Sequence, residues 1–103
     1  MFSIIIPTFN NLNYLKLCLE SIRKNSKYEH EIIIHVNEGA DGTIDYLKDK
    51  KFKTTYSNYN EGVCTAFNKA AIKSSKNFIV LAHDDMYFCP DWDIVFELSL
   101  IHI

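Results

Sequence analysis

The chain has 103 residues, enough for one hydrophobic core, and we expect a single domain over residues 1–103. It is 48% hydrophobic with a formal net charge of −2, so it lacks the broad positive field that binds a nucleic-acid backbone. Nucleic-acid binding is therefore not expected, and no apolar run is long enough to predict a membrane-spanning helix.

The cysteines and the start of the chain bear on its location. Cys18, Cys64 and Cys89 are odd in number and match no metal-binding spacing. We expect Cys18 and Cys64 on apolar helix faces, where a reduced thiol packs as a small hydrophobic group. The first residues lack a basic segment, and Pro7 interrupts their apolar run, so no signal peptide is predicted. These features predict a cytoplasmic protein, with the inner face of the membrane as the alternative.

The first element is a run of mostly β-branched residues at positions 3–6, which predicts a strand buried on both faces and ending at Pro7. Apolar side chains then recur at helical spacing, which predicts an amphipathic helix over residues 11–25. Asn10 or Asn11 is the expected N-cap of this helix.

The middle of the chain continues the alternation of strands and helices. A second strand is predicted over residues 31–36, and a turn-rich loop follows over residues 37–42. Residues 43–50 predict a short helix. The weak alternation of residues 52–57 predicts a third strand near an edge of the sheet.

The last third of the chain predicts a helix, a strand and a further helix. The inward face of the first helix is formed by Val63, Ala66, Phe67, Ala70 and Ala71. Residues 77–82 are apolar and predict a buried strand. Pro90 suits the first turn of a last helix, whose expected inward residues are Ile94, Val95 and Leu98. This order predicts a Rossmann-like three-layer α/β/α fold with a mainly parallel sheet.

A polar segment follows each of the four predicted strands. These segments, named the first to fourth loops, cover residues 7–10, 37–42, 58–62 and 83–85. Since ligands of open parallel sheets bind outside the carboxyl ends of the strands, the four segments predict one shaped polar site. The chain has no G-x-G-x-x-G sequence and no Walker lysine motif, which argues against a dinucleotide oxidoreductase and a P-loop NTPase.

Two adjacent aspartates, Asp84 and Asp85, come directly after the fourth predicted strand. Carboxylate oxygens suit Mg²⁺ or Mn²⁺ shared with a phosphate, and the cation would neutralise a diphosphate leaving group. The alternative is that one aspartate caps a turn and the other is solvated. His83 is open to interpretation as a third ligand, a base or neither.

Four segments match a known family in order and at the expected spacing. They are residues 3–11, 37–43, 60–68, which has an N-x-G-x-x-x-A-x-N pattern, and 82–92, which has an acidic pair and a trailing proline. On these segments the chain resembles the inverting GT-A glycosyltransferases of family 2, almost from end to end. The resemblance implies the nucleotide-sugar-binding half of the GT-A fold.

The resemblance also implies which residues hold the donor. Contacts to the nucleotide base and ribose would come from Pro7, Thr8, Phe9, Asn60 and Gly62. A carboxylate of the second loop would accept the base N–H, with Glu38 as the first candidate and Asn37 as the next. Asp84 would face the ribose or the metal, and Asp85 would be the metal ligand that holds the diphosphate.

The function implied by the resemblance is that of a glycosyltransferase that uses a nucleotide-diphosphate sugar, with a UDP-sugar as the expected donor and Mn²⁺ or Mg²⁺ as the cation. The sugar would pass with inversion to an acceptor hydroxyl of a saccharide or glycoconjugate, in polysaccharide or glycoconjugate synthesis. The alternative is a non-catalytic nucleotide-binding or regulatory module of the same fold. A receiver-like signalling domain is disfavoured, because no predicted strand ends at the lysine that it requires.

The chain departs from the family pattern in two loops. The second loop reads Asn37-Glu38 where the family usually has two aspartates, and it is one residue shorter before Asp41. His83 stands where many relatives have an acid, so the aspartates after it would serve alone. The longer Glu38 side chain shifts the acceptor for the base, so the resemblance leaves the base preference open.

The end of the chain is the third departure, because family members continue well past this point. We expect the general base outside this chain. Asp91 and Asp93 are candidates for it only by elimination, and the favoured interpretation is that they cap the last helix. Residues 99–103 are apolar and carry no stop signal. The two interpretations are a domain truncated at its C-terminal end and a homodimer that buries this tail.

Overall fold

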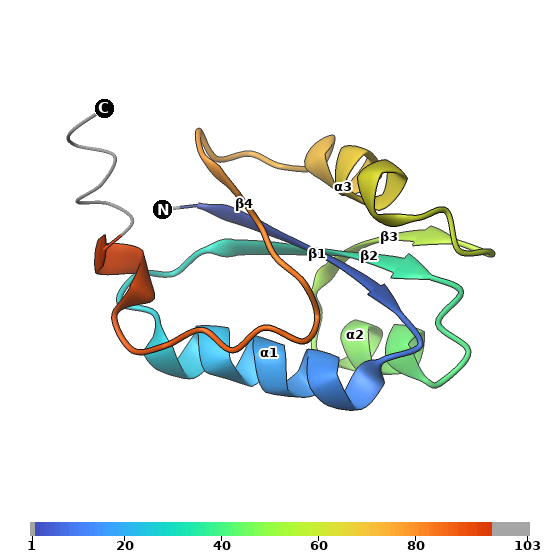
Figure 1. The fold of residues 1–103 in the computed structure, drawn as a ribbon, viewed down its shortest axis with the longest axis horizontal. Helices are drawn as coiled ribbons and strands as arrows, with labels where there is room; N and C mark the ends of the chain where they lie inside the picture. Colours follow the sequence, from blue (N-terminus) through green and yellow to red (C-terminus); the bar gives the residue numbers. More distant parts are fainter. Residues whose placement is uncertain (1, 96–103) are drawn as a thin grey trace.

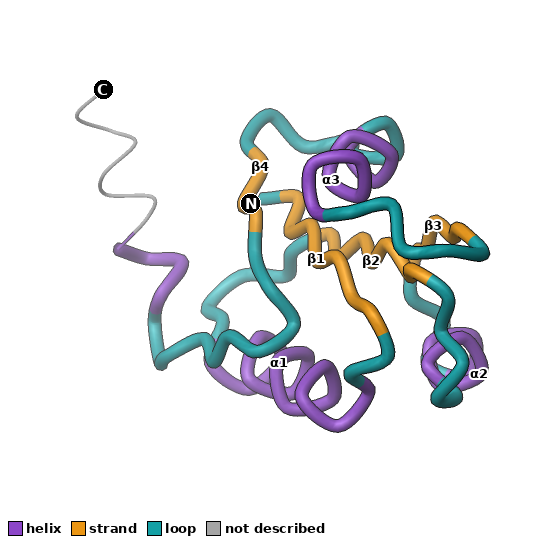
Figure 2. The backbone as a smooth tube through the Cα atoms, turned by 45° about the vertical axis from the view of Figure 1, so that its right-hand side comes forward, coloured by secondary structure: helices purple, strands orange, loops and turns teal. Residues whose placement is uncertain are grey.

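The computed structural model describes residues 2–95, which form a four-stranded parallel sheet with helices on both faces (Figure 1). The strands are β1 (Ser3–Phe9), β2 (Glu31–Asn37), β3 (Lys53–Ser57) and β4 (Ile79–Leu81), in the spatial order β3-β2-β1-β4. The helices are α1 (Leu12–Asn25), α2 (Thr43–Asp49) and α3 (Val63–Ala71). Figure 2 shows α1 and α2 on one face of the sheet and α3 on the other, so the predicted three-layer α/β/α fold is confirmed.

The alternation of side chains along β1 and β2 divides the core into two parts. Ile4 and Ile6 face α1 and α2, in a large cluster that includes Leu15 and Leu47. Ile5 faces α3 in a smaller cluster that is completed by Ile33, Ala70, Phe67 and Ala71. The run of isoleucines in β1 is fully buried on both faces, as its sequence predicts.

β1 continues through Pro7 to Phe9, so the prediction that the strand ends at Pro7 is wrong. The main-chain groups of Ile5 face β4, where Ala82 N donates to Ile5 O at 2.9 Å. Because a strand repeats every two residues, the missing N–H of Pro7 faces the same side, beyond the last residue of β4. The proline therefore removes no sheet hydrogen bond.

β3 lies at an edge of the sheet as predicted, but β4 forms the opposite edge and is not a buried strand. β4 has three residues, and Ile79 and Leu81 are 44% and 56% exposed. The apolar sequence of this segment indicates an apolar environment, which the described residues do not supply on that side. The expected burial is therefore wrong for Ile79 and Leu81, while Ala82 is buried as predicted.

Three side chains predicted to face inward are exposed: Val63, Cys64 and Val95. In α3 the buried face is set by Ala66 and Ala70, which are four residues apart. Cys64 lies two residues before Ala66, about 200° around the helix, and therefore points outward. The predicted last helix begins as a helical turn over residues 92–95, while Leu98 and the tail at 99–103 lie outside the described residues.

Asp93 anchors the segment after β4 to the end of α1, in place of the predicted helix cap. Its side chain is fully buried, and its Oδ1 accepts a hydrogen bond from Lys27 N at 3.0 Å. Its Oδ2 accepts from Tyr28 N and from His30 Nε2, both at 2.8 Å. His30 Nδ1 in turn accepts from Phe2 N at 3.0 Å, so this carboxylate joins the segment to α1 and to the start of β1.

None of the helices in the described part of the chain has the length and apolar character needed to cross a membrane.

Candidate functional site

The carboxyl ends of β1, β2 and β3 meet in register at one edge of the sheet. Phe9 is paired with Asn37, and Asn37 is paired with Ser57. β4 runs parallel to β1 and delivers residues 83–85 to the same edge. All the residues predicted to contact the donor or a metal lie in these strand ends or in the loops that follow them. The positions of these segments agree with the sequence analysis, while their contacts with a donor stay a prediction.

Thr8 and Asp84 join the first and last strand ends. The Thr8 hydroxyl, which is buried, donates to Asp84 Oδ2 at 2.8 Å across 76 positions of sequence. This bond fixes one oxygen of the half-buried carboxylate. Asp85, the next residue, is exposed and makes no hydrogen bond or ion pair with the described residues. The pair therefore combines a positioned carboxylate with a free one.

The two aspartates fit a cation that is shared with a phosphate. Within residues 2–95 no three histidine, cysteine or acidic side chains come together as a metal site, so His83 does not complete one. The His83 ring instead packs edge-on against Phe67, with centroids 6.1 Å apart. Mg²⁺ and Mn²⁺ at phosphate sites commonly take one or two protein carboxylates, with substrate oxygens and water completing the shell. Asp84 and Asp85 are the candidate carboxylates for such a shell.

Cys18 lies beneath the acidic pair. Burial, followed by the charges of Asp84 and Asp85, raises the pKa of the Cys18 thiol to about 12. The neutral thiol donates weakly to the His83 carbonyl oxygen at 3.7 Å. A neutral thiol supplies no positive charge to offset the two carboxylates.

The first and second loops are tied to each other by two side chains. Asn10 Oδ1 accepts from Ala40 N at 2.8 Å, and Asp41 Oδ2 accepts from Leu12 N at 2.9 Å. Asn11 occupies the N-cap position of α1 but makes no capping bond, so the predicted asparagine cap is replaced by Asp41 from another loop. Sequence spacing gives no signal for a cap that comes from 29 residues away.

We expect Asp41→Ala to lower the free energy of unfolding by about 1–2 kcal/mol, because it removes the cap of α1. Burial tends to raise the Asp41 pKa, but hydrogen bonds from Thr43 and from Leu12 N outweigh it and hold the pKa below its usual range. Chemical denaturation at pH 7 measures the loss. Asp49→Ala is the matched control, since that exposed carboxylate makes no hydrogen bond to the described residues; equal losses would contradict this role of Asp41.

The second loop turns sharply after β2. Glu38 and Gly39 both have positive φ, at 64° and 71°. A Cβ on Gly39 would lie 2.7 Å from a Val36 methyl carbon, so only glycine fits this turn. Glu38 N donates to Ser57 O at 2.9 Å, while the half-buried Glu38 side chain makes no hydrogen bond or ion pair with the described residues. The Glu38 carboxylate is therefore available at the edge of the sheet.

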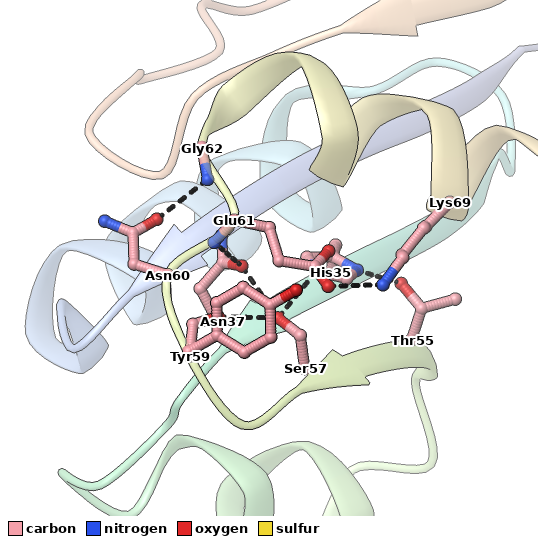
Figure 3. A network of polar contacts seen from close by, with 9 residues as sticks. All are labelled: His35, Asn37, Thr55, Ser57, Tyr59, Asn60, Glu61, Gly62 and Lys69. Carbon is pink, nitrogen blue, oxygen red and sulfur yellow. Dashed lines mark hydrogen bonds and ion pairs between the residues drawn. The ribbon is translucent and has the colours of Figure 1, made fainter.

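Asn37 is buried and braces the third loop, as Figure 3 shows. Its Oδ1 lies 2.9 Å from the Ser57 hydroxyl, which donates to it or to the Tyr59 carbonyl oxygen at the same distance. The same Oδ1 accepts from Glu61 N at 3.2 Å. Of the two candidates in the second loop, Asn37 is thus occupied within the protein and Glu38 is not.

Beneath this brace lies a buried imidazole beside a buried carboxylate. His35 Nδ1 is 2.6 Å from Thr55 Oγ1, and His35 Nε2 is 3.8 Å from Glu61 Oε2. The Glu61 side chain is 6% exposed; Lys69 pairs with its Oε1, while its Oε2 has no hydrogen-bond partner. His35 and Glu61 have no predicted role, because a single histidine in an apolar strand carries no distinctive spacing.

We expect the stability of the protein to fall between pH 7 and pH 5 in part through His35. Burial, partly opposed by the charge of Glu61, lowers the His35 pKa. A histidine whose pKa is lower in the folded state stabilises the fold above its unfolded pKa, near 6.5, and loses that contribution as the pH falls. Urea unfolding at both pH values should show a smaller acid loss for His35→Gln than for the wild type. Equal losses in the two proteins would contradict the prediction.

The remaining predicted residues lie on the open side of the edge. Phe9 is 45% exposed, so part of this side chain stays open to solvent at the edge. Asn60 Oδ1 accepts from Gly62 N at 3.0 Å, which shapes the turn into α3. Gly62 has φ 87° and open space around its α-carbon, so a ligand can approach the main chain there.

Sequence comparison identifies the class of protein that carries this edge. The family described as glycosyl transferase family 2 matches residues 3–94. The chain belongs to glycosyl transferase family 2. Its glycosyltransferase relatives and its fold agree with the resemblance inferred from the four loop segments.

Two curated relatives show the extent of the similarity. EpsH of Bacillus subtilis (strain 168) is 33% identical over 96 residues, which cover 87% of this chain and 27% of EpsH. The second relative, from Methanococcus voltae, is a dolichyl N-acetyl-alpha-D-glucosaminyl phosphate 3-beta-D-2,3-diacetamido-2,3-dideoxy-beta-D-glucuronosyltransferase. It is 31% identical over 101 residues, which cover 90% of this chain and 31% of that protein. This family 2 domain therefore spans less than a third of the length of either relative.

Solved structures of transferases share the fold of this family 2 domain. S. aureus TarS 1-349 in complex with UDP has a TM-score of 0.82 at 20% identity, covering 98% of this chain and 32% of that one. The mannosyltransferase PcManGT from Pyrobaculum calidifontis, in complex with GDP-Man and Mn²⁺, has a TM-score of 0.75 at 19% identity. The match covers 91% of this chain and 30% of PcManGT. Both support the GT-A nucleotide-binding half as the fold of this chain.

Proposed function

We propose that this family 2 domain binds a nucleotide-diphosphate sugar at the carboxyl edge of its sheet, with a divalent cation at Asp84 and Asp85. The observation that carries the proposal is the Thr8–Asp84 hydrogen bond, which fixes one carboxylate beside the free carboxylate of Asp85. Similar structures bind UDP in one case and GDP-Man with Mn²⁺ in another. The base is proposed to be uracil, with Mn²⁺ or Mg²⁺ as the cation.

The base and ribose are proposed to lie between the first and third loops. The exposed ring of Phe9 offers a stacking surface, and Pro7 and Thr8 support it from β1. Gly62 allows close approach of the ligand, and the Asn60 amide nitrogen remains available as a donor. Glu38 is the acceptor proposed for the base N–H, because Asn37 is occupied by Ser57 and Glu61 N.

A bound Mn²⁺ or Mg²⁺ would supply positive charge to the departing diphosphate. The protein's contribution is to hold Asp84 through Thr8 and to keep Asp85 free for coordination. The Cys18 thiol lies beneath the pair, and its Sγ contacts the His83 carbonyl oxygen at 3.7 Å. Asp93 is fully engaged at the other end of the sheet, so it is not proposed as the general base.

This chain is proposed to be the donor-binding part of a longer protein. That protein is proposed to transfer the sugar with inversion to a hydroxyl of a saccharide or glycoconjugate, and to act in the cytoplasm. The observation that favours this division is that the chain covers less than a third of its relatives, while all its candidate site residues concern the donor. A non-catalytic nucleotide-binding module is the second candidate, favoured by the Asn37-Glu38 pair in place of two aspartates.

Calorimetric titration of UDP, GDP and CDP, each with Mn²⁺ and with EDTA, tests the proposal. We expect binding of UDP that requires the metal and exceeds that of the other two nucleotides. Metal-dependent binding of GDP in preference to UDP would correct the base. Failure of all three to bind with Mn²⁺ would overturn the proposed donor site.

A further inference from the structure

A second concave surface lies at the opposite edge of the sheet, at the amino ends of the strands. It is an open pocket of about 870 Å³ between the end of α1, the turn from α2 to β3 and the loop before β4. The proposed donor site lies beyond the other ends of the same strands. The pocket therefore needs its own explanation.

Cationic side chains dominate this pocket although the chain as a whole has a net charge of −2. Six of the eleven lysines and arginines of the chain line it: Arg23, Lys27, Lys50, Lys51, Lys53 and Lys76. Only two lining residues, Glu29 and Glu31, are acidic. The cations that line this pocket therefore exceed the carboxylates by four charges.

Glu31 is already neutralised within the protein. It pairs with Lys53 and also accepts hydrogen bonds from the Ser3 hydroxyl at 2.7 Å and Ser75 N at 2.8 Å. The Lys53 contact, with these further bonds, lowers the Glu31 pKa to about 2. Among the described residues, the other five cations of the pocket form no ion pair.

Helix ends explain only part of this charge. Lysine and arginine are favoured in the last turn of a helix, where they offset the helix dipole, and Arg23 lies in the last turn of α1. Lys27 lies beyond the end of α1, Lys53 begins β3, and Lys76 precedes β4. These three positions are not set by a helix dipole, yet they face the same pocket.

Lys51 is the most informative of the six, because its main chain favours glycine. Its φ is 60°, in the left-handed region. Lys51 N bonds to Lys48 O at 3.1 Å, and Phe52 N bonds to Leu47 O at 3.1 Å. These two bonds form a Schellman motif, in which the residue at the position of Lys51 is usually glycine. A lysine there costs about 1 kcal/mol in backbone strain and keeps a positive charge at the pocket.

We propose that this cationic pocket is a second site, which binds a phosphate-bearing anion independently of the donor site. The cations come from separate elements and surround the pocket, so a multiply charged phosphate meets several of them at once. Tyr28, which is 40% exposed, adds an aromatic surface at the rim. The same chemistry fits a soluble diphosphate and a phospholipid headgroup.

The test is a titration of inorganic pyrophosphate, followed by NMR shifts of the amides of residues 50–53 and 75–76. EDTA is present throughout, so that a metal at the acidic pair cannot bind the probe. We expect shifts at these amides and an affinity that weakens with added salt. Lys51→Gly should raise the Kd about fivefold while the melting temperature stays the same or rises, since glycine relieves the strain.

Lys48→Ala is the matched control, because Lys48 lies in the last turn of α2 but does not line the pocket. It should leave the Kd for pyrophosphate unchanged. Sedimentation with phosphatidylglycerol vesicles and with neutral phosphatidylcholine vesicles tests the lipid source. Binding to the anionic but not to the neutral vesicles would support the site and assign it to a headgroup, provided that Lys51→Gly weakens this binding. Absence of binding to both pyrophosphate and anionic vesicles, or binding that Lys51→Gly leaves unchanged, would overturn the proposal.

Discussion

Asp85→Asn is expected to weaken metal-dependent binding of UDP by about 100-fold, or ~2.7 kcal/mol, without lowering the stability of the fold. The substitution removes one of the two proposed anionic ligands and leaves the side-chain size unchanged. Asp85 is exposed and makes no hydrogen bond with the described residues, and its loss relieves repulsion with Asp84. Calorimetry with Mn²⁺ and thermal denaturation measure the two effects.

Asp91→Asn is the control for this result. Asp91 is also exposed, lies six residues further along the chain, and has a φ of 61° that asparagine tolerates. Its affinity for UDP should equal that of the wild type. Equal affinities for Asp85→Asn and the wild type would show that Asp85 does not hold the metal.

Asp93→Asn is expected to lower the free energy of unfolding by about 3 kcal/mol or more, which is a large part of the stability of a domain of this size. Each oxygen of the buried carboxylate accepts hydrogen bonds, from Lys27 N on one side and from Tyr28 N and His30 Nε2 on the other. An amide group turns one oxygen into a donor that faces a donor, whichever way it is flipped. Urea denaturation at pH 7 measures the change.

The pH dependence of the same contact gives an independent check. Burial tends to raise the Asp93 pKa, but the hydrogen bonds from Lys27 N, Tyr28 N and His30 outweigh it and hold the pKa below its usual value. The stabilisation is therefore complete above the unfolded pKa, near 4, and is lost as the pH falls further. Asp93→Asn should lose less stability than Asp91→Asn on acidification below pH 4. A loss of stability at pH 7 as small as that of Asp91→Asn would contradict the anchoring role.

The parts of the fold that depend on local patterns could be predicted from the sequence. The isoleucines of β1 indicate burial on both faces, and the polar segments after the strands converge because parallel strands end at one edge. Asp84 and Asp85 are informative for the same reason, since a short strand places them directly at that edge. Local spacing is sufficient wherever an element's neighbours follow from its own periodicity.

The contacts that hold the edge and the far end together could not be predicted in this way. Asp41 caps a helix 29 residues away, and Asp93 accepts hydrogen bonds from residues 63 to 66 positions earlier. A carboxylate has the same sequence appearance whether it caps its own helix or another element. The burial predicted for the apolar strand around Ile79 was wrong for a related reason. An apolar pattern indicates that a strand is covered, but not which residues cover it.

The most direct test of the account is to map the position of Mn²⁺ in the protein with UDP bound, by its broadening of backbone amide signals. We predict the strongest broadening at residues 83–86, with a weaker effect at Thr8 and Phe9, and none at the amino edge around Lys51. Broadening centred elsewhere, or no broadening at saturating UDP, would contradict a metal-assisted donor site at Asp84 and Asp85.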